Sequence, residues 1–319
     1  MNKKICVIGA GYWGNNHVRT LNILKSLDGI VELDSVTLKS QLKKYPGIKG
    51  HSNIEDALLE DYDGFTIATP AKTHYEIAKK IIESHKPVLI EKPLALCFDE
   101  ADELASISKK NSVNVMVGHV LLFHPAVKKI KNIVESGKIG DLQYIYSNRL
   151  NLGKVRTEEN VFWSLAPHDI AIFQYLTNST PQRIKASGST FLQKGIPDST
   201  ITELEYPNGV KGHIFVSWLH PFKEQRLVVI GSEAMISFEG SSNESSLKFY
   251  SKKIDLKSGM PEKIDGPVKI IPFEKRMPLE IELNYFINHL GENKPSISNI
   301  YQGLEVIKIL EEASKQILK

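Results

Sequence analysis

The sequence predicts two domains: an α/β domain with a doubly wound parallel sheet, and then an α+β domain with a large, mostly antiparallel sheet. The chain has 319 residues, which is more than one hydrophobic core usually organises. Short apolar runs alternate with helical patterns over residues 1–120, as they do in parallel βαβ units. Residues 121–319 instead hold long stretches of β-type alternation and few helical segments, which is typical of an antiparallel sheet.

In the first domain, strands are expected at residues 5–8, 30–34, 64–70, 87–90 and 113–117. Helical patterns are expected after Gly14 and around 77–82 and 101–108. In the second domain, a helix is expected at 125–134 and another at 166–176. Strands are expected at 142–150, 184–192, 199–206, 209–218 and 226–238. The polar segment 252–269 predicts a surface loop, and residues 278–319 are helical by period, with a break near 291–296.

Composition excludes several classes of protein. The net charge is only +3, which argues against nucleic acid or an anionic membrane as the main partner. No apolar window approaches the length of a membrane span, and no signal peptide is expected. Cys6 and Cys97 lie in apolar surroundings, which favours buried free thiols over a disulfide or a metal pair and fits a reducing cytoplasm. No metal site is predicted.

A glycine motif, Gly9-x-Gly11-x-x-Gly14, follows the first expected strand and opens a helix. The first glycine permits a tight turn, the second lets the backbone approach a pyrophosphate, and the third lets the helix pack on the strand. Asp34 follows Gly14 by twenty residues, at the end of the second expected strand. An acid there accepts hydrogen bonds from a ribose diol and disfavours a 2′-phosphate, so the sequence predicts NAD as the cofactor.

An acid and an amine, Glu91 and Lys92, stand where the apolar run at 87–90 ends, and Pro93 follows them. In a doubly wound sheet, ligands bind outside the carboxyl ends of the strands. Lys92 is therefore expected near the nicotinamide, where an ammonium can stabilise a developing alkoxide or pass on a proton. On spacing alone, a solvated loop is the commoner alternative.

The order of the motifs resembles the glucose–fructose oxidoreductase / inositol dehydrogenase (Gfo/Idh/MocA) family over nearly the whole chain. The resemblance is carried by Gly9-Ala10-Gly11-Tyr12-Trp13-Gly14, Ala68-Thr69-Pro70 with His74, Glu91-Lys92-Pro93, and Gly118-His119 through Phe123-His124-Pro125. It implies an NAD-binding Rossmann domain at 1–120, a substrate-binding and oligomerisation domain at 121–319, and hydride transfer between nicotinamide and a sugar or polyol. It also implies that Lys92 contacts the reacting hydroxyl. The cofactor-binding residues that it implies are Gly9, Gly11, Tyr12, Trp13, Gly14, Asp34, Thr69, Pro70, His74 and Glu91.

The family's Asp-x-x-x-His motif corresponds here to the segment 163–169 (WSLAPHD). His168 falls on the family's histidine, which implies that it takes the hydroxyl proton while hydride leaves the same carbon. Ser164 stands in place of the family's aspartate, so the orientation of His168 is open. Asp169 is an alternative partner, although adjacent helix residues point about 100° apart. A packed histidine at a helix N-terminus is the structural alternative.

Residues 149–160 (RLNLGKVRTEEN) form a dense polar stretch. Arg149 and Asn151 share a strand face by alternation. Arg149 and Arg156 are candidates for binding a diphosphate, and Asn160 for reading a hydroxyl or an acetamido group. An exposed charged loop is an alternative of equal weight. Within a uronic acid substrate, a carboxylate at C6 requires a further cation, for which Arg156, Lys154 and Lys223 are candidates.

This stretch, with the segments 163–169 and 218–225 (WLHPFKEQ), is similar to the branch of the family found in nucleotide-sugar pathways. The resemblance implies NAD-dependent oxidation of the C3 hydroxyl of UDP-N-acetylglucosamine or its uronic acid. A PLP aminotransferase then converts the 3-keto sugar for lipid A or surface polysaccharide. The resemblance also implies a homodimer or homotetramer, joined through the second-domain sheet, where apolar alternation at Ile214, Val216 and Trp218 suggests a buried face. The implied substrate-binding residues are Arg149, Asn151, Arg156, Asn160, Trp163 and Lys223.

Two rival functions stay open at this point. An inositol or free-sugar dehydrogenase is disfavoured by the density of arginine at 149–156, because a neutral polyol needs no diphosphate clamp. A non-catalytic NAD-sensing regulator is disfavoured by Lys92 and His168, because a sensor needs neither an acid nor a base.

Overall fold

The computed structural model describes residues 3–153, 155–241, 246–256 and 259–318. The chain divides into two compact units. The first contains the chain up to Phe123 together with Arg276–Lys308, and the second contains His124–Lys275 and the residues from Ile309 onward. The division after Phe123 lies close to the expected boundary at residue 120. Residues 276–308, which the sequence analysis places in the second domain, belong to the first unit.

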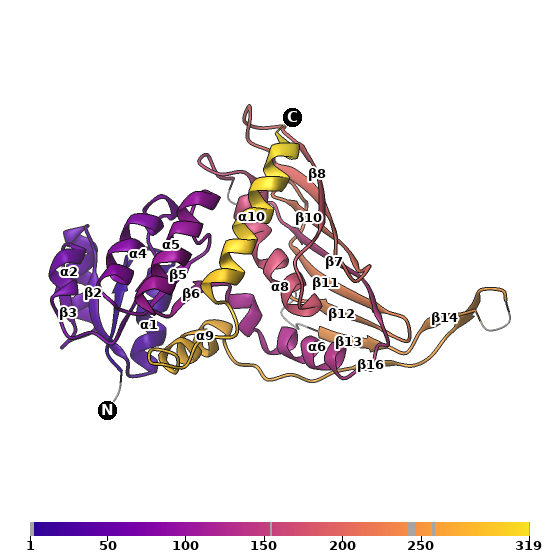
Figure 1. Ribbon diagram of the computed structural model, residues 1–319, viewed down its shortest axis with the longest axis horizontal. Helices are drawn as coiled ribbons and strands as arrows, with labels where there is room; N and C mark the ends of the chain where they lie inside the picture. Colours follow the sequence, from indigo (N-terminus) through magenta and orange to yellow (C-terminus); the bar gives the residue numbers. More distant parts are fainter. Residues whose placement is uncertain (1–2, 154, 242–245, 257–258, 319) are drawn as a thin grey trace. The chain divides into compact units, whose positions relative to one another are not determined.

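The first unit is built on a six-stranded sheet in the order β3-β2-β1-β4-β5-β6, and all of its pairings are parallel (Figure 1). The strands are β1 (Ile5–Ile8), β2 (Leu27–Val31), β3 (Lys49–His51), β4 (Gly64–Ile67), β5 (Val88–Glu91) and β6 (Val115–Gly118). The doubly wound sheet is thereby confirmed. Strand order reverses between β1 and β4, and in such sheets the reversal opens the crevice where a dinucleotide binds.

Helices connect these strands, and each of them except the second, residues 35–44, buries apolar side chains. They are α1 (Gly14–Ile23), α2 (Ser35–Lys44), α3 (Ile54–Leu58), α4 (His74–Glu83) and α5 (Phe98–Asn111), with short 3-10 helices η1 (Ala71–Thr73) and η2 (Val120–Phe123). Strands β1, β4, β5 and β6 are buried throughout. Burial on both faces explains why these strands are continuous apolar runs in the sequence.

Residues near the C-terminus complete the first unit. Helix α9 (Pro278–Ile287) packs on α1 and η2, and its Leu279, Leu283 and Phe286 are buried. The hydroxyl of Ser298 donates to the carbonyl of Val117 in β6. These residues were assigned to the second domain because their helical period does not reveal which sheet buries them. The last helix, α10 (Ile300–Ile317), begins in the first unit and ends in the second.

The second unit is built on an eight-stranded sheet in the order β16-β13-β12-β11-β7-β10-β9-β8. All of its pairings are antiparallel except that of β7 with β10, which confirms the mostly antiparallel sheet. Its strands are β7 (Leu142–Leu150), β8 (Arg183–Ser189), β9 (Ser199–Glu205), β10 (Lys211–Ser217), β11 (Glu224–Gly231), β12 (Met235–Glu239), β13 (Ser246–Tyr250) and β16 (Val268–Ile270). The stretch expected as one strand at 226–238 is the hairpin of β11 and β12.

Helices cover one face of the eight-stranded sheet. Helix α7 (Val161–Leu165) contacts β9 and β10, α8 (Pro167–Thr177) contacts β7 and β10, and α6 (Pro125–Glu135) packs on α8. Gly212 lies under the ring of Phe173, where an added Cβ would come within 2.8 Å of it. Ile214, Val216 and Trp218 are buried. Their apolar alternation therefore reflects packing under the chain's own helices.

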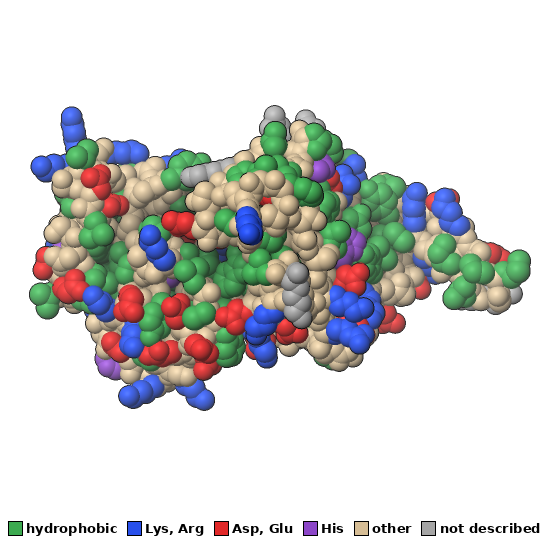
Figure 2. Space-filling view, turned by 90° about the horizontal axis from the view of Figure 1, so that it is seen from above, with side chains coloured by type: hydrophobic (Ala, Val, Ile, Leu, Met, Phe, Trp, Pro, Cys, Tyr) green, Lys and Arg blue, Asp and Glu red, His purple; other side chains and the backbone are tan. Residues whose placement is uncertain are grey.

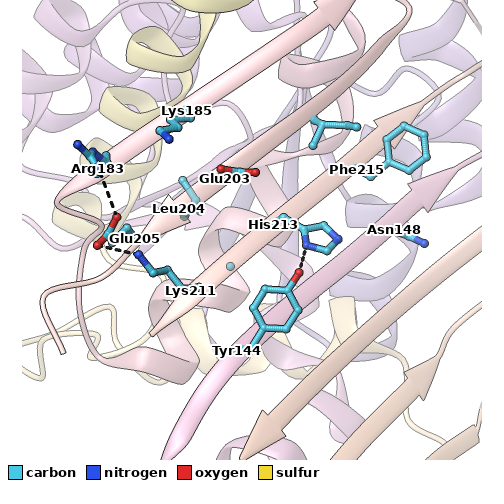
Figure 3. Close-up of a pocket in the computed structure, with 12 residues that line it drawn as sticks. Tyr144, Asn148, Arg183, Lys185, Glu203, Leu204, Glu205, Lys211, His213 and Phe215 are labelled. Carbon is cyan, nitrogen blue, oxygen red and sulfur yellow. Dashed lines mark hydrogen bonds and ion pairs between the residues drawn. The ribbon is translucent and has the colours of Figure 1, made fainter. Parts of the chain in front are cut away.

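The opposite face of this sheet carries polar and aromatic side chains around a hollow of about 550 Å³ (Figure 3). Glu205 pairs with Lys211 and Arg183, and Tyr144 is hydrogen-bonded to His213. Other lining residues are Asn148, Lys185, Ile201, Glu203, Leu204, Gly212 and Phe215. Charges of both signs alternate along this face.

The segment 252–269, expected to be a surface loop, contains a two-stranded arm that extends beyond the edge of the eight-stranded sheet (Figure 1). It is formed by β14 (Lys253–Asp255) and β15 (Glu262–Ile264), which pair antiparallel. Ile254, Leu256 and Met260 on this arm are exposed.

Charged side chains of both signs are interspersed on the surface shown in Figure 2. This distribution agrees with the small net charge of the chain. None of the helices in the described ranges has the length and apolar character needed to cross a bilayer. Within the same ranges, no group of three or more His, Cys, Asp or Glu side chains is arranged to hold a metal ion.

Candidate active site

The glycine-rich turn after β1 has the geometry that a dinucleotide requires. Gly9 has φ +86°, a conformation that disfavours residues with a Cβ. A Cβ on Gly14 would lie 1.9 Å from the carbonyl oxygen of Gly9, so the start of α1 packs directly on the turn. Gly11 has no described atom within 4 Å of its would-be Cβ. The backbone at Gly11 is therefore open to a pyrophosphate at the N-terminus of α1, and the residues present fit NAD.

Two further residues of this turn were predicted to contact the cofactor. Tyr12 is 95% exposed and Trp13 is 39% exposed. The ring of Tyr12 is thus accessible to a ligand, whereas the indole of Trp13 is partly held by the protein.

Two acidic residues, Glu32 and Asp34, follow β2, and Asp34 was predicted to bind the ribose diol. The strand ends at Val31, three residues before Asp34, instead of at Asp34. Asp34 caps helix α2, and its Oδ2 accepts hydrogen bonds from the backbone N–H and the hydroxyl of Thr37, which lower the pKa of its carboxyl. Glu32 lies nearer the glycine-rich turn, because its carboxylate accepts from the backbone N–H of Ala10 at 2.8 Å. Sequence reasoning missed Glu32, although it is also an acid close to the end of β2.

Glu91, the last residue of β5, is buried beneath the glycine-rich turn. Its Oε1 accepts hydrogen bonds from the indole N–H of Trp13 at 2.6 Å and from Nε2 of His17 at 2.8 Å. Burial alone would raise the pKa of Glu91, but these donors and the charge of Lys92 leave it below its ordinary value. Glu91 is therefore a buried carboxylate, and within the protein it contacts Trp13 and His17.

Lys92 follows β5 at the edge of the sheet where the carboxyl ends of the parallel strands lie. Its peptide bond to Pro93 is cis. His119, just after β6, is 2% exposed, and its burial lowers its pKa to about 4. The charges of Glu91 and Lys92 both act on His119. Lys92 thus belongs to a group of titratable side chains gathered at the ends of β5 and β6.

His74 connects the turn after β4 to the Glu-Lys-Pro segment. Its ring nitrogens lie 2.8 Å from the carbonyl oxygen of Pro93 and 3.0 Å from that of Thr69. The ring is 1% exposed, and burial lowers its pKa despite these two bonds. His74 therefore holds the turn at Thr69 and Pro70 in place, and cofactor contact by that turn stays a prediction.

His168 lies in the first turn of α8, in the second unit. Helix α7, which carries Ser164, ends at Leu165, and α8 begins at Pro167, so Ser164 and His168 lie on two successive helices. The single helix expected at 166–176 corresponds to α8. Asp169, the alternative partner for His168, accepts two hydrogen bonds from Arg149.

The predicted substrate-binding residues lie at one end of the eight-stranded sheet, in the segment before α7 and, for Trp163, within α7 itself. Asn151 directly follows β7, and its backbone N–H donates to Ser217. Lys223 is exposed and directly precedes β11, whose Glu224 pairs with Leu150. Register therefore brings Asn151 and Lys223 to the same end of the sheet.

The other predicted residues of this group make contacts within the protein. Asn160 caps α7 by accepting from the backbone N–H of Trp163, whose indole donates to Ser314 at 2.9 Å. Arg156 is half exposed, lies 3.8 Å from the carboxylate of Glu159, and accepts at its backbone carbonyl from Gln193. Lys154 lies outside the described residues. Arg156 is thus the arginine of this stretch that is more accessible to a ligand.

Comparison with known proteins identifies the class to which this fold and site belong. The family model described as "Oxidoreductase family, NAD-binding Rossmann fold" matches residues 3–119, and the "GFO/IDH/MocA C-terminal domain" matches residues 127–237. With the open glycine-rich turn, these matches define an NAD-dependent oxidoreductase. The chain belongs to the Gfo/Idh/MocA family, as its motifs indicated.

Two relatives and one solved structure illustrate the range of the family. UDP-N-acetylglucosamine 3-dehydrogenase from Acidithiobacillus ferrooxidans is 24% identical over 307 residues, which cover 94% of this chain and 93% of that protein. The NAD(+)-dependent scyllo-inositol 2-dehydrogenase from Bacillus subtilis is 26% identical over 267 residues, or 78% of this chain and 77% of that protein. A solved structure of the A. ferrooxidans enzyme aligns with a TM-score of 0.88 at 21% identity, covering 100% of this chain and 98% of that chain. The structural likeness supports the fold.

Proposed function

We propose that the protein uses NAD to oxidise the C3 hydroxyl of a UDP-sugar, UDP-N-acetylglucosamine or its uronic acid, to the 3-keto sugar. The observation that carries this proposal is the similarity, over 94% of this chain, to a UDP-N-acetylglucosamine 3-dehydrogenase. The polar stretch between β7 and α7 supports it, because a diphosphate requires cations and hydrogen-bond donors.

The proposed reaction gives a role to each of the predicted catalytic residues. Bound NAD supplies a hydride acceptor at its nicotinamide. Lys92 would hydrogen-bond the C3 oxygen and stabilise negative charge as it develops there. His168 would accept the hydroxyl proton, which an imidazole can do near neutral pH. The turn at Thr69 and Pro70, held by His74, would line the nicotinamide side.

The substrate would contact the end of the eight-stranded sheet. Arg156 and Lys223 are exposed or half exposed and carry no close ion pair in the described residues beyond the long contact of Arg156 with Glu159. They would neutralise the diphosphate, or the C6 carboxylate of a uronic acid. Asn151 would read a hydroxyl or acetamido group. Arg149 would act mainly through Asp169, which already binds its guanidinium.

The first test is NADH absorbance on mixing the enzyme and NAD with each UDP-sugar and with myo-inositol in turn. Glutamate and a PLP aminotransferase would draw off a keto product. Turnover with one UDP-sugar alone supports the proposal, and turnover with inositol alone overturns it. A Lys92→Ala variant should bind NAD and lose turnover. A protein that only senses NAD would be indifferent to that change.

A polyol dehydrogenase is the second candidate, because the scyllo-inositol enzyme matches 78% of this chain at a similar identity. A neutral polyol carries no diphosphate, so Arg156→Gln and Lys223→Gln would leave its KM unchanged. With a UDP-sugar, the same substitutions should raise KM about tenfold each, the expected loss for a charge-assisted hydrogen bond. This pair of variants distinguishes the two candidates.

The proposal extends to the oligomeric state of the protein, the reaction that follows and its location. The open face of the eight-stranded sheet, with its paired charges and aromatic rings (Figure 3), would join subunits into a homodimer or homotetramer. The 3-keto product would pass to a PLP aminotransferase for 3-amino-sugar synthesis in lipid A or surface polysaccharide. Free Cys6 and Cys97 fit a cytoplasmic location.

A further inference from the structure

Glu91 connects three segments that meet beneath the cofactor turn. Trp13 belongs to the glycine-rich turn, His17 belongs to α1, and Lys92 follows Glu91 at the end of β5. Trp13 and His17 both donate to Oε1, while Oε2 lies 3.2 Å from the backbone nitrogen of Lys92. A single carboxylate therefore bridges the turn that faces the pyrophosphate and the backbone that carries Lys92.

The neighbouring strand is shaped to admit this carboxylate. Gly118 of β6 is the register partner of Glu91. A Cβ at Gly118 would come within 2.9 Å of Cδ and Oε2 of Glu91. The absence of a side chain at residue 118 thus makes the space in which the carboxylate is buried.

The surroundings of the two ring nitrogens of His17 indicate which of them carries the proton. Its Nε2 faces the carboxylate, whereas Nδ1 is buried with no hydrogen-bond partner among the described residues. A buried N–H without an acceptor costs more than a buried lone pair without a donor. We therefore assign the proton to Nε2, so that His17 donates to Glu91.

A second carboxyl group lies in the same core. Glu282 of α9 is fully buried, and neither of its oxygens has a hydrogen-bond partner among the described residues. Burial, and then the charge of Glu91, raise the pKa of Glu282 well above its ordinary value. Burial therefore favours the protonated form of Glu282, while the negative charge of this core is stabilised on Glu91, which has the N–H donors.

We propose that Glu91 is a positioning residue that fastens the glycine-rich turn to the end of β5, so that bound NAD and Lys92 hold each other in place. This role differs from the direct cofactor contact that the sequence resemblance implies for Glu91. The part of the inference that concerns NAD rests on the NAD-binding fold alone. The part that concerns turnover rests on the proposed function of Lys92.

The test compares Glu91→Gln, Trp13→Phe and the double variant by calorimetric titration with NAD. Gln keeps the shape of the side chain but removes the charge, and Phe keeps an aromatic ring but removes the indole N–H donor together with one ring of the side chain. Each single substitution should weaken NAD binding about tenfold, as expected for a charged hydrogen bond. The NAD affinity of the double variant should equal that of the single variant with the lower affinity, because both changes remove the same interaction.

The matched control is Trp218→Phe in the second unit. Trp218 is a buried indole that, like Trp13, donates to a carboxylate, that of Asp198 at 2.5 Å. Its loss should lower the melting temperature and leave the NAD affinity unchanged. Trp13→Phe tests the inference even if Glu91→Gln does not fold, because Trp13 is partly exposed and its replacement leaves the carboxylate and His17 in place.

Lys92 supplies a readout that needs no substrate. Its rate of reductive methylation, followed by mass spectrometry, should fall when NAD binds the wild-type protein, and this protection should be lost in Glu91→Gln. Unchanged NAD affinity in both single variants, fully additive losses in the double variant, or intact protection of Lys92 would each overturn the inference. If the wild type turns over no UDP-sugar, the proposed function fails while these binding and labelling results still decide the role of Glu91.

Discussion

Arg149 donates from Nε and Nη2 to the two carboxylate oxygens of Asp169, at 2.8 and 2.9 Å. Both side chains are buried, with 13% and 4% of their areas exposed. Burial alone would lower the pKa of Arg149, but the charge and hydrogen bonds of Asp169 raise it. The pair joins β7 to the first turn of α8, beside His168. Arg149 therefore serves to fix the helix that carries the proposed base.

We expect Asp169→Asn to lower the free energy of unfolding by about 3 kcal/mol, because it leaves the guanidinium buried without its counter-charge. Replacing both residues together, by Arg149→Met and Asp169→Leu, should recover most of that loss. Urea unfolding of the three variants measures both effects. A loss below about 1 kcal/mol in Asp169→Asn would indicate a pair that contributes as little as an exposed one.

Two substitutions in the glycine-rich turn should differ in their effect on the stability of the fold. Gly11→Ala adds a methyl group where the protein leaves open space, so the melting temperature should be unchanged while NAD affinity falls at least tenfold. Gly14→Ala forces a Cβ against the carbonyl of Gly9, so it should destabilise the fold as well. Differential scanning fluorimetry with and without NAD separates the two. Unimpaired NAD binding by Gly11→Ala would contradict the assigned pyrophosphate site.

Substitution of Asp34 can distinguish its two possible roles, as the cap of α2 and as a ligand of the ribose diol. If Asp34 serves only as the cap of α2, Asp34→Ala should cost about 1 kcal/mol of stability and leave NAD affinity unchanged. If it also binds the ribose diol, as the sequence predicts, NAD affinity should fall about tenfold in addition. We expect both losses, because the cap uses Oδ2. Asp34→Ser, which retains a capping oxygen, should restore the stability and leave the NAD loss in place.

Glu282 predicts a dependence of stability on pH. Its pKa is raised in the folded state above the ordinary value of 4.5, so the folded protein retains a proton that the unfolded chain releases. The stability linked to this proton is fully present below pH 4.5 and is lost as the pH rises through the raised pKa of the folded state.

We therefore expect Glu282→Gln, which is neutral at every pH, to gain stability relative to the wild type as the pH rises. Melting temperatures measured from about pH 5 to about pH 9 test this expectation. Parallel melting curves for the two proteins across that range would contradict a neutral, buried Glu282. Glu280→Gln on the same helix is the control: its carboxylate is partly exposed and pairs with Arg276, and the variant should show no such divergence.

The sequence predicted best where one local pattern decides the structure. The glycine-rich turn and the apolar runs of β1, β4, β5 and β6 were recognisable because tight turns and strands buried on both faces leave strong local signals. Asp34 was placed on a strand because the apolar alternation continues to Leu33, whereas the strand ends at Val31 and Asp34 caps α2 by accepting from Thr37. The resemblance of the ordered motifs, rather than any one of them, supplied the family.

The remaining features depend on partners distant in sequence. Arg149 was expected to face a ligand because its partner, Asp169, lies on another element twenty residues away. The resemblance implies that Glu91 contacts the cofactor, which stays a prediction, but nothing local indicates that Trp13 and His17 converge on it. Residues 276–308 show an amphipathic period but give no sign of the sheet that buries them. Pairing across long sequence separations is the information that local patterns lack.

The unit that binds NAD is assembled from two segments that are separated in sequence by most of the second unit. The side-chain amide of Asn114 donates to the backbone carbonyls of His289, Gly291 and Asn293, and α9 covers α1. A ribosome makes the strands of the parallel sheet first and their last covering helix only after the whole intervening unit. During synthesis, the apolar surface under α9 therefore stays exposed until that helix has been made. That surface is covered only when residues 278–287 have emerged.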